Sequence, residues 1–260
     1  MHILAQNLPD AWFQALYSIV DTKDDSNEFK NSYLYTVQQG SYAGQRRLEF
    51  PEMLMEIEHP LSEPLLPYFP EGMNLPPVAD MEYVFDYFTN YLMDSHVPPN
   101  TAYTYGSRIC TPVREDVTQL DLLISRLQDH PRSNQLILQI AEPMDIKLTD
   151  PPCFRALQMK VVEDRLDFHI VFRSNHLWCG FPVNLAAIAL LMKYTLLYVP
   201  DLKPGKFIYF SSGLHLYEHD FDLAAIRLFK SDLPFGEAEN CDERTLKNLL
   251  EDIGIHSNDI

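Results

Sequence analysis

The sequence is poor in positive charge. Its 260 residues include 20 Lys and Arg against 37 Asp and Glu, so 20 − 37 gives a formal net charge of −17. No segment concentrates Lys and Arg, and an acidic surface repels both phosphate backbones and anionic lipid headgroups. We therefore expect neither nucleic-acid binding nor membrane binding.

Cysteine, glycine and long apolar runs are also scarce. The four cysteines form no C-x-x-C pair, and 9 glycines with 19 prolines fit neither collagen nor a low-complexity repeat. The start MHILAQNLPDAWFQ lacks a basic and apolar leader, and the longest apolar run, 185–199, contains Lys193. That run falls short of the roughly 20 residues that cross a bilayer. We expect a globular, cytoplasmic protein with free thiols.

Helical and extended periodicities alternate irregularly along the chain. Helical spacing predicts helices over the following ranges: 8–20, 80–93, 117–129, 185–199, 223–229 and 243–252. Alternating or β-rich stretches predict strands in the following ranges: 33–60, 136–140, 154–162, 166–172, 207–212 and 214–217. Six prolines between Pro60 and Pro77 predict an irregular surface excursion. This order favours an α+β fold, with helices on one face of a mixed sheet.

A rigid turn precedes one of the cysteines. In Asp150-Pro151-Pro152-Cys153, two prolines restrict the backbone directly ahead of the thiol. Such a turn can position Cys153 as a nucleophile, although an ordinary buried cysteine is the other interpretation.

Two further clusters carry polar side chains. Arg173 and Ser174 close a strand and can hold an anion, while Asn184 lies at a helix start and can read the edge of a heterocycle or simply cap the helix. His215 and Tyr217 point to the same side of an extended segment and can bind one ligand together. The same segment allows another reading, in which His215, His219 and Asp220 bind a metal.

The order of these clusters resembles thymidylate synthase and its pyrimidine-nucleotide hydroxymethylase relatives. The matching pattern is Asp-Pro-Pro-Cys, then Arg-Ser-x5-Gly-x-Pro-x-Asn-x-Ala-x2-Ala-Leu-Leu, then Leu-x-Pro-Gly-x-Phe and His-x-Tyr, and the match covers residues 151–153, 173–191 and 202–217. It extends upstream to Tyr105-Gly106-Ser107-Arg108, and residues 81–217 are covered in all. Four motifs in register make a chance match improbable.

The resemblance implies transfer of a one-carbon unit to C5 of a uracil nucleotide such as dUMP. The implied donor is 5,10-methylenetetrahydrofolate, and the implied assembly is a homodimer of one α+β domain spanning 1–260. Cys153 corresponds to the nucleophile that adds to C6, with Tyr105 and Glu82 in the proton-transfer network. The implied nucleotide-binding residues are Arg173, Ser174, Asn184, His215, Tyr217 and Arg47. His176 and Trp178 fall in the folate-binding part of the pattern, and no metal is implied.

The sequence also departs from the family pattern. Asn134 and Gln135 replace two arginines that reach the partner's phosphate site in the family, and His176 replaces an aspartate. Phe154 and Phe172 stand where a histidine and a glutamine are usual. These departures keep two alternatives open. One is a relative that uses the same thiol addition on another pyrimidine substrate, or without folate. The other is a non-enzymatic member, or a metal-dependent enzyme that uses His215, His219 and Asp220.

Overall fold

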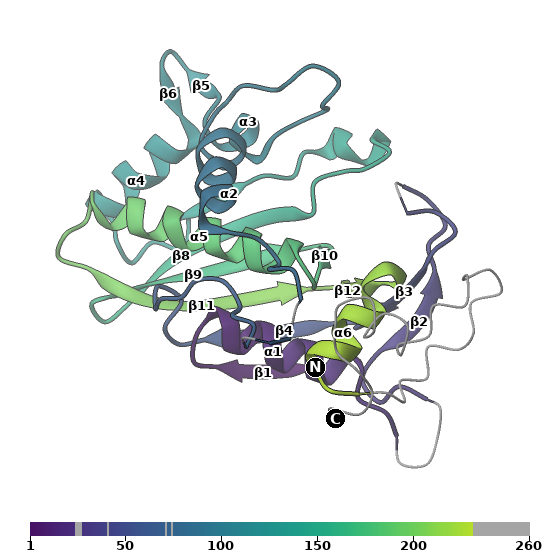
Figure 1. The fold of residues 1–260 in the computed structure, drawn as a ribbon. Coiled ribbons are helices and arrows are strands. Elements are labelled where there is room, and N and C mark those ends of the chain that lie inside the picture. Colours follow the sequence, from purple (N-terminus) through teal and green to yellow (C-terminus); the bar gives the residue numbers. More distant parts are fainter. Residues whose placement is uncertain (24–27, 41, 71, 74, 231–260) are drawn as a thin grey trace.

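A computed structural model describes residues 1–23, 28–40, 42–70, 72–73 and 75–230 of the chain (Figure 1). Its largest element is a six-stranded sheet with the strand order β1-β4-β11-β9-β8-β7. Its strands are β1 (His2–Ala5), β4 (Met53–Ile57), β11 (Lys203–Ser211), β9 (Arg165–Phe172), β8 (Phe154–Val162) and β7 (Ile137–Gln139). The β1/β4 and β11/β9 pairs are parallel and the other pairs antiparallel, so the sheet is mixed as expected.

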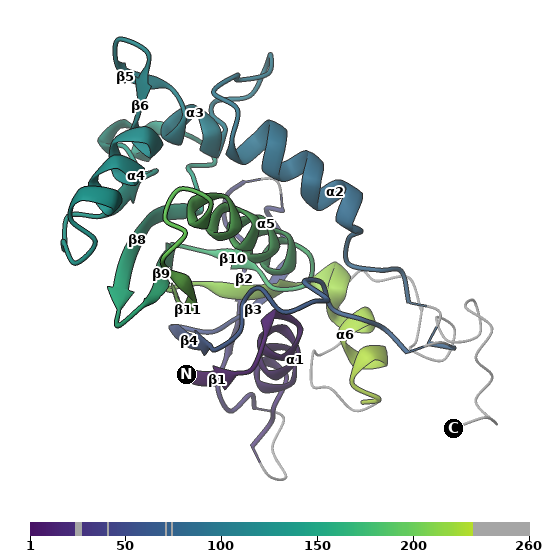
Figure 2. The same cartoon turned by 90° about the vertical axis from the view of Figure 1, so that its left-hand side faces the viewer.

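Helices cover one face of this sheet (Figure 2). Helix α5 (Gly180–Leu196) is apolar on nearly all sides, and α1 (Leu8–Ile19) packs beside it. On β9 and β11 the side chains alternate, so Phe168 and Phe207 are fully buried while Val171 and Phe210 on the other face are exposed. The buried helix predicted over 185–199 is confirmed.

A second sheet of four strands lies at one end of the molecule (Figure 1), in the order β10-β12-β3-β2. Its strands are β10 (Asn175–His176), β12 (Leu214–Tyr217), β3 (Arg46–Glu49) and β2 (Tyr33–Thr36). Because directly paired residues project from the same face of a sheet, the register decides which side chains meet here. It places His176 opposite His215, and His215 opposite Glu49.

The remaining elements are short helices, 3₁₀ turns and one hairpin. The helix predicted over 80–93 is α2 (Met81–Asp86) continued by a π-helix (Tyr87–Leu92). The other short elements are α3 (Tyr105–Ile109), a hairpin of β5 (Pro112–Arg114) and β6 (Val117–Thr118), α4 (Gln119–Asp129), 3₁₀ turns at Pro143–Lys147 and Glu218–Asp220, and α6 (Phe221–Arg227). The helical periodicity over 117–129 is confirmed by the buried side chains of α4.

Two other predictions concern the excursion and the C-terminal helix. Among the described residues of 60–77, neither a helix nor a strand occurs, in agreement with the proline content. The helix predicted over 243–252 lies outside the described residues. No helix in the described ranges is long and apolar enough to cross a membrane.

Candidate active site

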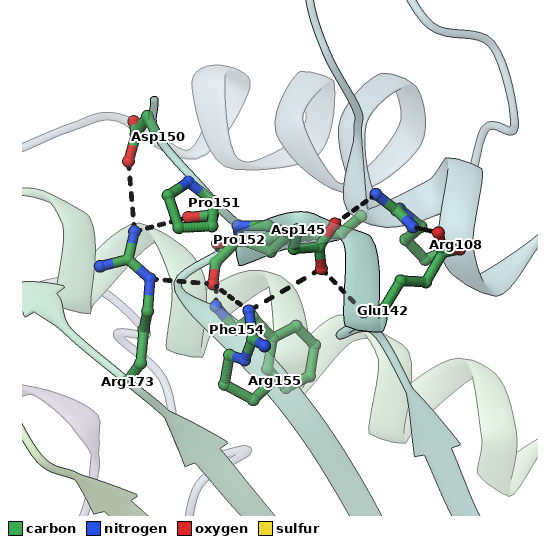
Figure 3. Close-up of polar contacts among 10 residues, drawn as sticks. Arg108, Glu142, Asp145, Asp150, Pro151, Pro152, Phe154, Arg155 and Arg173 are labelled. Atoms are coloured by element: carbon green, nitrogen blue, oxygen red, sulfur yellow. Dashed lines mark hydrogen bonds and ion pairs between the residues drawn. The ribbon is translucent and has the colours of Figure 1, made fainter. Parts of the chain in front are cut away.

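The turn that carries Cys153 is held by arginines from two strands (Figure 3). The guanidinium of Arg173, at the end of β9, donates to the carbonyl oxygens of Pro151 at 2.5 Å and Pro152 at 3.2 Å, and pairs with Asp150. Arg155, at the start of β8, donates to the same Pro152 oxygen at 3.1 Å. The turn thus has little freedom to move, which fixes the thiol that follows it.

A buried carboxylate lies between Arg155 of this turn and Arg108 (Figure 3). Asp145, only 2% exposed, binds Arg108 at 2.7 Å and lies 3.8 Å from the guanidinium of Arg155. Arg108 also pairs with Glu142, whose backbone N–H donates to Asp145 at 2.7 Å. Burial of a charge requires such compensation. Arg108, the arginine of the Tyr-Gly-Ser-Arg motif, therefore stabilises the turn of Cys153 through Asp145 and Arg155.

The environment of the thiol raises its pKa. Burial of Cys153 is the dominant cause, and Asp150 adds to it, while Arg173 and Arg155 act in the opposite direction. Arg173 alone would lower the pKa of this thiol, because a nearby cation favours the thiolate, but burial outweighs it.

Tyr105 lies directly above this turn. Its hydroxyl accepts a hydrogen bond from the N–H of Phe154 at 3.3 Å, and its ring packs edge-on against that phenylalanine at 5.4 Å. Burial and the neighbouring Cys153 hold the pKa of Tyr105 well above its usual value, so the hydroxyl keeps its proton. Thr104 caps α3 at its N-terminus and fixes this position. The structure thus brings Tyr105 and Cys153 together.

Asn184 belongs to a chain of hydrogen bonds that sequence reasoning missed. Its amide nitrogen donates to Asn175 at 3.1 Å, and its oxygen accepts from the hydroxyl of Tyr87 at 2.7 Å. Asn175 in turn donates to Tyr209 at 3.2 Å. The amide nitrogen of Asn184 retains one free hydrogen and its oxygen one free lone pair. The side chain can therefore still bind one acceptor and one donor of a base.

The structure does not bring Glu82 to this cluster. It lies exposed on the first turn of α2, and in the described part of the chain no hydrogen bond or ion pair joins it to Cys153 or Tyr105. Tyr87, in the π-helix that follows, reaches Asn184 instead. A π-helix changes the direction of the side chains beyond it, and such helices are frequent at functional sites.

One face of the four-stranded sheet gathers the remaining predicted residues. Tyr217 is paired with Arg47, and the rings of His215 and Tyr217 lie 4.5 Å apart. Arg47 binds Glu49 at 2.9 Å. Burial raises the pKa of this carboxyl, and Arg47 opposes the rise. Glu49 was not predicted, because only the strand register reveals that it shares this face.

His215 presents an unpaired acceptor. Its Nδ1 lies 2.8 Å from the carbonyl oxygen of Gly213 and 3.2 Å from Ser174, so Nδ1 carries the proton. Burial lowers the pKa of His215 to about 3, and the ring is neutral at pH 7. Its Nε2 and the Nε of Arg47 are buried without a hydrogen-bond partner among the described residues. Buried polar atoms of this kind mark a place for a ligand.

His176 stands beside this face in a different chemical setting. Its Nε2 lies 2.6 Å from Asp220 and its Nδ1 lies 3.3 Å from the sulfur of Cys179. Burial opposes protonation of His176, but the bonds to Asp220 and Cys179 prevail and raise its pKa to about 9. The ring stacks parallel to that of His215 at 5.9 Å. Trp178, in contrast, is 5% exposed and packs against Trp12 and Phe69.

The three residues that the sequence suggests as metal ligands do not form one cluster. His215 does not join the other two, whereas donor atoms of His176, His219 and Asp220 lie within 4.8 Å of one another. As the structure stands, Asp220 is paired with the imidazole of His176 and lies 3.5 Å from that of His219.

The residues that depart from the family pattern have packing or hydrogen-bond partners within the chain. Phe154 and Phe172 are fully buried and stack on each other at 5.1 Å. Gln135 accepts from Arg126, and the carbonyl of Asn134 accepts from Gln158, at the start of β7. Arg46 binds Glu218 at 2.8 Å.

Comparison with known proteins now identifies the family. The model of the thymidylate synthase family matches residues 84–256, which is more than half of the chain. The chain belongs to the thymidylate synthase family. This confirms the resemblance of the motifs, and the mixed sheet with helices on one face agrees with the expected fold.

Relatives in this family range from archaea to viruses. A protein of Methanosarcina acetivorans named "Putative thymidylate synthase" is 27% identical over 222 residues, or 85% of this chain and 91% of its own. The thymidylate synthase of Mycoplasma genitalium is 32% identical over 118 residues, covering 45% of this chain and 41% of its own. That of varicella-zoster virus is 31% identical over 124 residues, with 47% and 41% covered.

Proposed function

We propose that the protein transfers a one-carbon unit to C5 of a uracil nucleotide, with dUMP as the expected substrate. Membership of the thymidylate synthase family supports this class of reaction. Two observations carry the proposal: Cys153 lies on a turn held by Arg173, and two buried nitrogen atoms, those of His215 and Arg47, have no partner among the described residues. Ser174, which follows Arg173, lies 3.2 Å from His215 and so links the two.

The proposed first step is addition of the Cys153 thiolate to C6. The S–C6 bond forms, the C5–C6 electron pair moves toward O4 as an enolate, and C5 becomes nucleophilic toward the one-carbon donor. Loss of the C5 proton and expulsion of the thiolate then restore the ring. Because burial raises the pKa of this thiol, the proton must leave the sulfur as the S–C6 bond forms.

The nucleotide would be held by the residues of the predicted set that the structure gathers. The free acceptor and donor of Asn184 suit the N3–H and O4 of uracil. The Nε2 of His215 can accept a hydrogen bond from a sugar hydroxyl, with Tyr217 beside it. Arg173, Ser174 and Arg47 are the proposed phosphate ligands, and Tyr105 is the proposed proton-transfer group above the thiol.

The proposed one-carbon donor is 5,10-methylenetetrahydrofolate, bound on the side of His176. The fit here is weaker than for the nucleotide, because Trp178 packs in the core and His176 is already paired with Asp220. The paired imidazole of His176 still presents a polar surface beside the stacked ring of His215. The burial of Trp178 and the pairing of His176 favour a second candidate, in which the same thiol acts on another pyrimidine substrate without folate.

Tritium release tests the central step. With [5-³H]dUMP and methylenetetrahydrofolate, we expect release of tritium that Cys153→Ala abolishes and Cys110→Ala, which alters another described thiol, leaves intact. Unchanged release by Cys153→Ala would refute the proposed adduct. The product mass then distinguishes methylation from hydroxymethylation, and calorimetry with methylenetetrahydrofolate alone and with dUMP distinguishes the folate-free alternative.

We also propose a homodimer formed through the open face of the six-stranded sheet. Leu54, Val171 and Phe210 are between 37% and 40% exposed on that face. Apolar side chains on adjoining strands are typical of an interface. Sedimentation of the wild type is expected to show a dimer, and Phe210→Asp is expected to sediment as a monomer. A monomeric wild type would overturn this assignment.

A further inference from the structure

Cys179 lies in a setting unlike those of the other described thiols. It is the N-cap residue of α5, a helix of 17 residues, and its side chain is partly exposed. The N-terminal end of a helix carries a partial positive charge that favours a thiolate. Cys110 is also partly exposed, but partial burial together with the nearby carboxylates of Asp121 and Asp94 raises its pKa to about 11.

A histidine and an aspartate complete this setting. The sulfur of Cys179 lies 3.3 Å from Nδ1 of His176, and the opposite nitrogen of that ring lies 2.6 Å from Asp220. The carboxylate side chain is only 4% exposed, so it has little water to compete with the imidazole. The aspartate therefore orients the ring and stabilises its positive charge, and the ring directs Nδ1–H toward the sulfur.

We propose that Cys179 is a second reactive thiol of this protein, activated by His176 and Asp220, and that low-molecular-weight disulfides modify it. In this step the thiolate attacks one sulfur of the disulfide and a new S–S bond forms to Cys179. The original S–S bond breaks, and its other sulfur leaves as a thiol after taking up a proton. Cys179 is oxidised and the disulfide is reduced, so atoms and electrons balance.

The position of this thiol gives the modification a consequence. His176 stacks on His215, which belongs to the face proposed to bind the nucleotide sugar. A group attached to Cys179 removes the sulfur from Nδ1 of His176 and adds bulk beside that stack. We therefore expect modification to weaken nucleotide binding; this consequence rests on the proposed function, whereas the reactivity of the thiol does not.

Alkylation at several pH values tests the reactivity. An ordinary thiol is about 3% ionised at pH 7, so its rate rises nearly tenfold per pH unit. For the full chain treated with iodoacetamide and mapped by peptide mass, we expect Cys179 to react about tenfold faster than Cys110 at pH 7. Its rate should change little between pH 6 and 8, whereas the rate of Cys110 should keep rising.

Two variants separate activation from mere exposure. His176→Asn and, independently, Asp220→Asn should slow alkylation of Cys179 about tenfold at pH 7 and restore the ordinary rise with pH. The reaction of Cys110 serves as the internal control for folding. If Cys179 reacts no faster than Cys110 at pH 7, or if both variants keep the flat pH profile, the proposal is wrong.

A disulfide arm tests the modification itself. With glutathione disulfide and peptide mapping, we expect an adduct on Cys179 that dithiothreitol reverses and that Cys179→Ser lacks, while Cys110 carries none. Absence of this adduct overturns the modification even if alkylation is fast. Loss of dUMP affinity in the adduct is measured separately by calorimetry, so failure of the proposed nucleotide function leaves the thiol chemistry testable.

Discussion

The ion pair of His176 and Asp220 predicts a specific dependence of stability on pH. Burial opposes protonation of His176, but its bonds to Asp220 and to Cys179 raise its pKa to about 9, against the ordinary value of 6.5. The difference of about 2.5 pKa units corresponds to about 3 kcal/mol at ~1.4 kcal/mol per unit. The side chains are only 17% and 4% exposed, so solvent screening reduces this value little.

The sign follows from which state binds the proton. Between pH 6.5 and 9 the folded protein keeps the proton on His176 whereas the unfolded chain has lost it. A raised pKa therefore contributes its full stabilisation below pH 6.5, and this contribution is lost as the pH rises through 9. Asp220→Asn removes the carboxylate that supplies part of this stabilisation, so the variant should lose that part and keep the part that comes from Cys179.

Urea unfolding of the wild type and Asp220→Asn at pH 6, 7, 8 and 9.5 measures the effect. We expect the difference in free energy of unfolding to shrink from pH 6 to pH 9.5 by up to about 3 kcal/mol, the upper limit in which Asp220 supplies the whole shift. Titrating groups that do not contact Asp220 are common to both proteins and cancel in the difference, whereas His219, 3.5 Å from Asp220, does not. A difference that stays constant over this range would show that His176 does not hold its proton through Asp220.

Three further predictions concern the site and its support. Because burial raises the pKa of Cys153, its alkylation by iodoacetamide should still increase above pH 9, and a plateau at pH 7 would contradict this. Glu49→Gln releases Arg47 from its ion pair, so the calorimetric Kd of dUMP should fall several-fold; an unchanged Kd would argue against Arg47 as a phosphate ligand. A methyl group in Gly106→Ala overlaps the backbone of Asp94, which should cost at least about 1–3 kcal/mol in chemical denaturation, and wild-type stability would refute the packing.

Local periodicity was sufficient to predict most of the fold. The apolar spacing of α1 and α4 and the alternation of β8 and β9 are properties of short segments, so the sequence reveals them directly. The π-helix is different, because its apolar pattern resembles that of an α-helix and only the wider turn distinguishes it. The irregular pairing of strands into two sheets depends on contacts between distant segments, and the sequence pattern predicts only that the sheet is mixed.

The candidate site was predictable where one motif carries it. Cys153 and Arg173 lie in such motifs, and the structure joins them through the backbone N–H of Arg173 and the carbonyl of Cys153 at 2.9 Å. Glu49, and the pairing of Asp220 with His176, could not be predicted in this way. Glu49 faces His215 only through strand register, and Asp220 reaches His176 across 44 residues of sequence.

The two aromatic departures show why isolated substitutions mislead. Phe154 and Phe172 each replace a polar residue of the family pattern, which taken singly indicates a damaged site. In the structure the two rings stack on each other, and Tyr105 packs on one of them. Replacing both members of a polar pair with apolar groups leaves no unsatisfied atom behind. The two substitutions are therefore best understood together, as a stacked aromatic pair next to Cys153.

The scarcity of positive charge acts most strongly at the proposed phosphate site, where each arginine already has a carboxylate partner. An incoming phosphate must take over the guanidinium from that partner, and the carboxylate must then be solvated elsewhere. Asp150, the partner of Arg173, is 76% exposed, whereas Glu49 and Glu218, the partners of Arg47 and Arg46, are 15% and 21% exposed. An exposed carboxylate regains water easily when its partner leaves, whereas a buried one does not. Arg173 is therefore the arginine that a phosphate can engage at the lowest cost in free energy, and Arg47 becomes available as Glu49 is protonated.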